Sequence, residues 1–155
     1  TGTTPKTTNT ENFGDFIPFL GPGDIANDGN IIYGNNKGLS ELGLKEARLV
    51  QPNSILVTCI GSIGKSGIVD RICACNQQIN IVFANFANYK LVYYFIISSY
   101  FQELMQTKST GTVMPIINKG IFEQIYIPLP PLKEQEKIVK ILDELFTLKK
   151  ALRVE

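Results

Sequence analysis

Apolar residues along much of this chain fall into short runs bounded by turns, and only at 89–106 and near the C-terminus do they follow a helical period. The run "SILVTCI" (54–60) follows a Pro-Asn turn and predicts a strand. The next stretch, "SGIVDRICACN" (66–76), has no helical period and predicts a second strand, with "GSIGK" (61–65) as the bend between them. Further on, "ICACNQQINIVFAN" (72–85) alternates around a polar centre and predicts one or two strands.

Helix caps, glycines and prolines indicate the elements in the remaining segments of the chain. The first thirty residues are loop-rich, and segment 37–49 fits a short helix or an irregular loop. Asn88 is a candidate N-cap for a helix over 89–106. A strand is predicted from Ile121 to Ile127, ended by the prolines at 128–131. The apolar positions expected on the buried face of the helix are Leu91, Tyr94, Phe95, Phe101, Leu104 and Met105.

The last segment predicts a helix with an apolar seam spaced as in a coiled coil. The seam residues recur at intervals of three and four, and they are Ile138, Ile141, Leu145, Leu148 and Leu152. Such a stripe must find a partner, which is either the chain's own domain or another helix. The prolines before it favour another helix, because they separate the segment from the domain. We therefore predict a domain at 1–130 and a coiled-coil helix at 131–155.

Composition narrows the function classes. The 155 residues, 44% hydrophobic, suffice for one domain with an appendage, and a net charge of +1 shows no global basic field. No run of about 18 apolar residues predicts a membrane span, and no signal peptide is visible in a chain that begins "TGTTPK". The absence of histidine removes the commonest general base and metal ligand. Cys73 and Cys75 alternate on one strand face, so with Cys59 we expect reduced core thiols of a cytosolic protein, not a metal or redox site.

The stretch "CIGSIGKS" (59–66) resembles the end of a phosphate-binding P-loop, G-x-x-x-x-G-K-[ST]. Cys59, however, stands where the pattern requires its first glycine, and a strand rather than a helix is predicted to follow. A nucleotide cradle needs that helix N-terminus. A small enzyme with Lys65 at a phosphate site is therefore kept only as an alternative.

Five ordered motifs make the chain resemble the specificity subunit of bacterial type I restriction-modification enzymes. They cover nearly its whole length, and the last is the most specific: "GTTPK", "IPFLGPGDI", "ILVTCIGSIGKSGIV", "CNQQINIVFAN" and "GTVMPIINKGIFEQIYIPLPPLKEQEKIVKIL". The resemblance implies an α+β fold, in which a mixed or antiparallel, β-rich target recognition domain is followed by a long C-terminal coiled-coil helix. It also implies recognition of one half of a split target in double-stranded DNA.

The resemblance further implies how such a chain works in an assembly. Family subunits hold two such units, whose helices pair as an antiparallel coiled coil and dock methyltransferase subunits, and through them restriction subunits. The chain would be non-catalytic and need no cofactor, since other subunits bind the methyl donor and ATP. We expect a bacterial or archaeal cytoplasmic protein, either a fragment or a half-length subunit that forms a homodimer through its seam. The alternatives are the recognition domain of a fused type II restriction-methylation enzyme and a coiled-coil module that does not contact DNA.

Polar loops supply the residue types that bind phosphates and base edges. The candidate DNA-binding residues are Thr4, Lys6, Thr7, Ser62, Lys65, Ser66, Asn76, Gln77, Lys108, Ser109, Thr110 and Lys119. The same residue types are ordinary loop formers, so Asn76 and Gln77 are equally well explained as scaffold. Base readers are expected where the family pattern is loosest, at Thr7–Asn12, Asn35–Lys37 and Lys108–Thr110. A DNA reader would gather these loops on one basic face.

Overall fold

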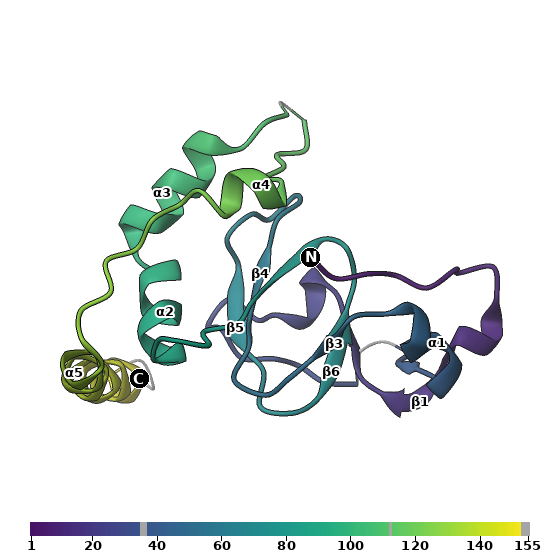
Figure 1. Cartoon of the computed structure of the whole chain (residues 1–155), viewed down its shortest axis with the longest axis horizontal. Coiled ribbons are helices and arrows are strands. Elements are labelled where there is room, and N and C mark those ends of the chain that lie inside the picture. Colours follow the sequence, from purple (N-terminus) through teal and green to yellow (C-terminus); the bar gives the residue numbers. More distant parts are fainter. Residues whose placement is uncertain (35–36, 112, 153–155) are drawn as a thin grey trace.

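Two small three-stranded sheets form the centre of the molecule, whose computed structural model describes residues 1–34, 37–111 and 113–152 (Figure 1). One sheet has the order β5-β4-β7, with strands Ser66–Ile68, Ile55–Thr58 and Ile79–Val82, all antiparallel. The other has the order β2-β6-β3, with strands Phe19–Leu20, Cys73–Cys75 and Leu49–Val50, and β2 pairs with β6 in parallel. The expected mixed α+β fold is confirmed, as is the bend at 61–65 between two strands.

Short elements complete the N-terminal part and place it beside the second sheet. They are the 3-10 turns η1 (Thr10–Asn12) and η2 (Pro22–Asp24), strand β1 (Phe13–Ile17) and helix α1 (Glu41–Glu46). Helix α1 begins because the Ser40 hydroxyl accepts a hydrogen bond from the amide of Gly43 at 3.1 Å. Of the two possibilities for segment 37–49, the structure has the short helix.

Strand β4 joins the two hydrophobic clusters of the core, because its alternating side chains are buried on both faces. Ile55 and Val57 pack in a cluster with helices α2 (Tyr89–Ile96) and α3 (Ser99–Lys108). Leu56 packs on the other face in a cluster that contains Cys73 and Cys75. The polar segment Asn76–Gln78 separates β6 from β7, so the predicted one or two strands are two.

The single helix predicted over 89–106 is two helices. Its start is confirmed, since the Asn88 side chain accepts a hydrogen bond from the Lys90 amide at 3.0 Å. The break comes at Ser98, whose hydroxyl caps α3 by accepting from the Phe101 amide at 3.3 Å. Through such bonds a serine side chain can cap a new helix and so interrupt a longer one. The spacing of apolar residues gives no sign of this interruption. Of the expected buried face, the side chains that are buried are Leu91, Phe101 and Met105.

The strand predicted over 121–127 is wrong. Helix α4 (Lys119–Phe122) begins there instead, because Asn118 caps it by accepting from the Ile121 amide at 2.9 Å. Its Phe122 ring meets Phe101 edge-on at 6.0 Å. Beyond α4, Ile125 and Ile127 pack on the core, but among the described residues their segment pairs with no strand. The alternation of apolar residues here therefore comes from an extended segment that packs on the core.

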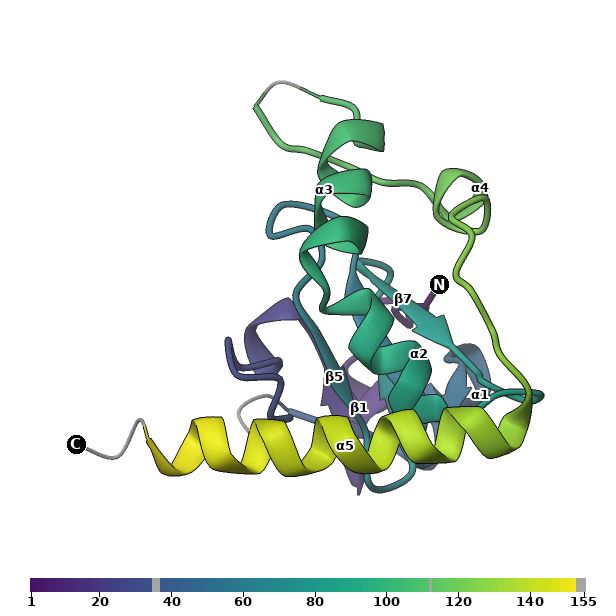
Figure 2. The same ribbon diagram turned by 90° about the vertical axis from the view of Figure 1, so that its left-hand side faces the viewer.

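Helix α5 (Leu132–Ala151) runs across one end of the domain beneath α2 (Figure 2). Its inward face is centred on Gln135 and Val139, which are buried. The five seam residues lie on the other side, from 37% exposed at Ile138 to 82% at Leu152. The alternative that the seam packs on the chain's own domain is therefore wrong, because a different face of α5 makes those contacts.

Candidate nucleic-acid interface

The loop of the β4–β5 hairpin is closed by its own backbone. The Gly64 amide donates to Thr58 O at 3.0 Å, and the Thr58 amide donates to Lys65 O at 2.9 Å. Strand β5 follows directly at Ser66, so the loop does not lead into a helix as a P-loop requires, and the P-loop hypothesis is excluded. Ser62 is exposed and Lys65 half-buried, with its Nζ 3.4 Å from Pro22 O. Ser66 is buried, so its hydroxyl is not accessible to a phosphate in this conformation.

The loop after α3 lies against this hairpin and makes one continuous end of the domain. Thr110 and Ile116 exchange backbone hydrogen bonds of 2.8 and 2.7 Å, which close the loop. The Gly61 amide donates to Pro115 O at 2.9 Å and ties the loop to the hairpin. Exposed Lys108 and Thr110 and half-buried Ser109 therefore lie in a loop bonded to the one that presents Ser62.

The N-terminal candidates form a second group beside the β6–β7 turn. Here the Gly2 amide donates to Ile79 O at 2.9 Å, and a Cβ on Gly2 would lie 2.3 Å from Cys75 O. Thr4 donates its hydroxyl to the side-chain oxygen of Gln77. Asn76 Oδ1 accepts from the Gln78 amide at 3.0 Å, which is a scaffold contact in the turn.

The remaining candidates are Lys6, Thr7 and Lys119, and of these Lys119 lines a cavity together with Thr1 of the N-terminal group. The backbone of Lys6 contacts Glu46 of α1 at 3.3 Å, so Lys6 and Thr7 belong to the edge of the domain that carries α1. Lys119 forms an exposed ion pair with Glu123 at 3.3 Å. The two groups adjoin each other, because the Cys59 amide at the base of the hairpin loop donates to Gln78 O in the β6–β7 turn at 2.8 Å. Of the regions expected to hold base readers, Asn35 and Asn36 lie outside the described residues.

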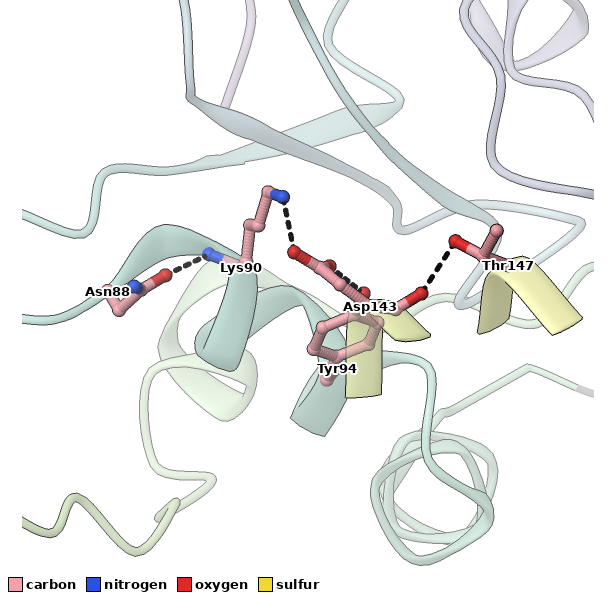
Figure 3. Close-up of polar contacts among 5 residues, drawn as sticks. All are labelled: Asn88, Lys90, Tyr94, Asp143 and Thr147. Atoms are coloured by element: carbon pink, nitrogen blue, oxygen red, sulfur yellow. Dashed lines mark hydrogen bonds and ion pairs between the residues drawn. The ribbon is translucent and has the colours of Figure 1, made fainter. Parts of the chain in front are cut away.

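Helix α5 is joined to α2 by a polar latch that sequence patterns did not suggest (Figure 3). Lys90 Nζ lies 2.7 Å from the Asp143 carboxylate, which also accepts a hydrogen bond from the Tyr94 hydroxyl. Burial alone would raise the pKa of Asp143, but the bonds from Lys90 and Tyr94 outweigh it and hold that pKa below its usual value. Next to them the rings of Tyr94 and Phe146 stack at 5.0 Å. The latch fixes the direction of α5, and with it the direction of the exposed seam.

The three cysteines are buried and unpaired, as expected for core residues. Burial raises the pKa of the Cys73 and Cys75 thiols to about 12, so both stay protonated at neutral pH. Among the residues that the structure describes, no three His, Cys, Asp or Glu side chains gather as a metal site would require. Within the same residues, no helix has the length and apolar character to cross a membrane.

A family model described as "Type I restriction modification DNA specificity domain" matches residues 1–155. The chain belongs to this family. The specificity subunit of the type I restriction enzyme MjaIX from Methanocaldococcus jannaschii is 30% identical over 96% of this chain and 36% of its own length. That of HindI from Haemophilus influenzae is 28% identical over 92% of this chain and 33% of its own length. This specificity domain thus spans about one third of these relatives.

Solved structures share the fold of the specificity domain. The HsdS subunit from Thermoanaerobacter tengcongensis matches 99% of this chain with 36% of its own, at a TM-score of 0.66 and 18% identity. A chain from a study of complex assembly and conformational transition in the type I R-M system matches 98% of this chain with 37% of its own, at a TM-score of 0.72 and 18% identity. These likenesses confirm the architecture, including the long C-terminal helix.

Proposed function

We propose that this domain recognises one half of a split target in double-stranded DNA as part of a specificity subunit. The observation that carries the proposal is the match of the family model over the whole chain. The hairpin loop and the loop after α3 support the proposal. Their backbones are hydrogen-bonded to each other, so Ser62, Lys108 and Thr110 lie at the same end of the domain. Hydroxyl and ammonium groups of this kind bind phosphates and base edges.

The proposal divides the chain into a recognition domain, 1–130, and a helix, 131–155, that belongs to the assembly. The exposed seam of α5 pairs with a second helix, either from another part of the same subunit or from a second copy. Methyltransferase subunits dock on this assembly and bring restriction subunits with them. The chain itself makes no bond in the substrate, needs no cofactor and works in the cytoplasm.

Selection of DNA from a random pool tests the proposal. The protein that contains this domain is assembled with its methyltransferase subunits, and bound duplexes are sequenced after several rounds. Enrichment of one split sequence, with affinity that falls as salt rises, is the expected result. A pool that stays random while the complex remains intact would contradict DNA recognition and favour the coiled-coil module, for which the exposed seam is the specific support.

A further inference from the structure

A cavity of about 750 Å³ opens where α5 passes the β4–β5 hairpin and the turn at residues 27–30. Three lysines line it: Lys65 from the hairpin, and Lys149 and Lys150 from the last turn of α5. The cavity therefore collects positive charge from segments that are far apart in the sequence. Only Lys65 was expected to matter from the sequence, because the other two are ordinary helix-end lysines until the fold brings them to this cavity.

Asp28 is the only acidic side chain among the described residues that line the cavity, and it is already engaged. Its two carboxylate oxygens accept hydrogen bonds from Asn30, one from the amide at 3.1 Å and one from the side chain at 2.6 Å. None of the ion pairs formed by the described residues joins Asp28 to a lysine of the cavity. The three lysines therefore outnumber the single carboxylate of the lining, and the cavity keeps a net positive charge.

The latch holds this end of α5 over the hairpin. Phe146 lines the cavity and stacks on Tyr94, which is bonded to Asp143. Lys149 Nζ lies 5.9 Å from the centre of the Phe146 ring, within the range of a cation–π contact. Neutral donors complete the lining, with the side chains of Asn27 and Gln102. Aromatic and amide groups beside ammonium groups suit an anionic ligand that carries an apolar part.

We infer that this cavity seats a phosphate of the DNA backbone together with its sugar, and that α5 therefore contacts DNA as well as its partner helix. The inference rests on the proposed function and adds a position at which the DNA duplex contacts the domain. Lysine binds phosphate as a point charge without regard to sequence, so the contact contributes affinity and register rather than selectivity. Lysines in the last turn of a helix ordinarily interact favourably with the helix dipole. In that role alone they would not contribute to DNA affinity.

The salt dependence of DNA binding separates these two roles. The full protein in complex with its methyltransferase subunits is compared with the double variant Lys149→Gln/Lys150→Gln. The matched control is Lys133→Gln/Lys137→Gln, which removes the same charge from exposed positions in the first turns of the same helix. We expect the slope of log affinity against log salt to become shallower by about one for each cavity lysine and to stay unchanged in the control. The loss is the same for target and non-target duplexes.

Chemical footprinting of the unaltered protein provides a measurement that does not depend on how a variant folds. The intact complex is treated with an acetylating reagent alone, with a duplex, or with inorganic phosphate at the same phosphate concentration. We expect the duplex to protect Lys65, Lys149 and Lys150 several-fold, and inorganic phosphate to protect them little.

Equal protection by inorganic phosphate would make the cavity a site for a free anion and overturn its assignment to DNA. A complex that selects its target while both double variants keep the wild-type slope would overturn the inference and leave the proposed function standing. A wild-type complex that binds no duplex would overturn both.

Discussion

Lys90 on α2 and Asp143 on α5 meet at 2.7 Å, although they lie 53 residues apart in the sequence. The pair is about 40% exposed on each side, so its own contribution to stability is modest, about 1 kcal/mol or less. Its effect is geometric, because together with the Tyr94 hydroxyl it sets the rotation of α5. That rotation turns Val139 inward and leaves Ile141 and Leu145 exposed.

The latch makes stability depend on pH in the acid range. The pKa of Asp143 is held below its usual value, so the latch contributes fully above about pH 5 and is lost as the pH falls below about 4. The difference in unfolding free energy between the wild type and Asp143→Asn should therefore shrink on acidification. Urea unfolding at several pH values from 3 to 7 measures it, and a difference that grows toward pH 3 would contradict the latch.

The seam should govern association without affecting the fold of the domain. Leu145 and Leu148 are both more than half exposed, so Leu145→Glu/Leu148→Glu should change the unfolding free energy by only about 0.5 kcal/mol. It should abolish pairing of α5 with another helix, because each pairing leucine contributes about 1.5–3 kcal/mol when buried. Mass in solution and co-purification with methyltransferase subunits report the effect. Lys140→Glu, which also shifts the charge by two but off the seam, is the control, and unchanged association in the double variant would contradict the role of the seam.

Two glycines of the hairpin loop should differ sharply when replaced by alanine. Gly64 has φ +87°, and a Cβ there would lie 2.3 Å from the side-chain oxygen of Gln102, whose amide nitrogen donates to Gly64 O at 3.0 Å. Gly61 has φ +73° but open space around it. Gly61→Ala should cost about 1–2 kcal/mol from backbone strain alone. Gly64→Ala should cost more, because Gln102 can move away only by giving up its hydrogen bonds to Gly64 O and Ile96 O. Denaturant unfolding compares them, and equal losses would show that the contact with Gln102 does not matter.

The cysteines should resist alkylation in the folded protein. At pH 8 Cys73 and Cys75 are buried thiols with a pKa of about 12, and only thiolates react at an appreciable rate. Mass spectrometry after iodoacetamide should find all three unmodified until denaturant is added. Rapid labelling of Cys73 without unfolding would place it at a surface.

The sequence predicted the elements whose signals are local. The strand around 54–60, the Asn88 cap and the C-terminal helix follow from periodicity and capping within a few residues. The single strand predicted over 66–76 is wrong, because β5 and β6 are separate strands that belong to different sheets. The sequence also failed at Ser98 and at 121–127, where a side-chain cap competes with the apolar pattern. It could not find the Lys90–Asp143 latch or the cavity that Lys149 and Lys65 both line, because both depend on how α5 docks. The candidate residues were chosen by type alone, which is why Ser66 is buried and Lys6 lies apart.

The map of methylated positions in cellular DNA tests the central claim most directly. Cells that make the protein containing this domain with its methyltransferase subunits are compared with cells that make the methyltransferase subunits alone. The account predicts methylation at one split sequence, and only in cells that make the protein. It also predicts that one half of this sequence changes when the domain's loops at 60–64 and 108–111 are exchanged for those of a relative. Methylation that is absent, or a sequence unaltered in both halves by the exchange, would contradict DNA recognition by this domain.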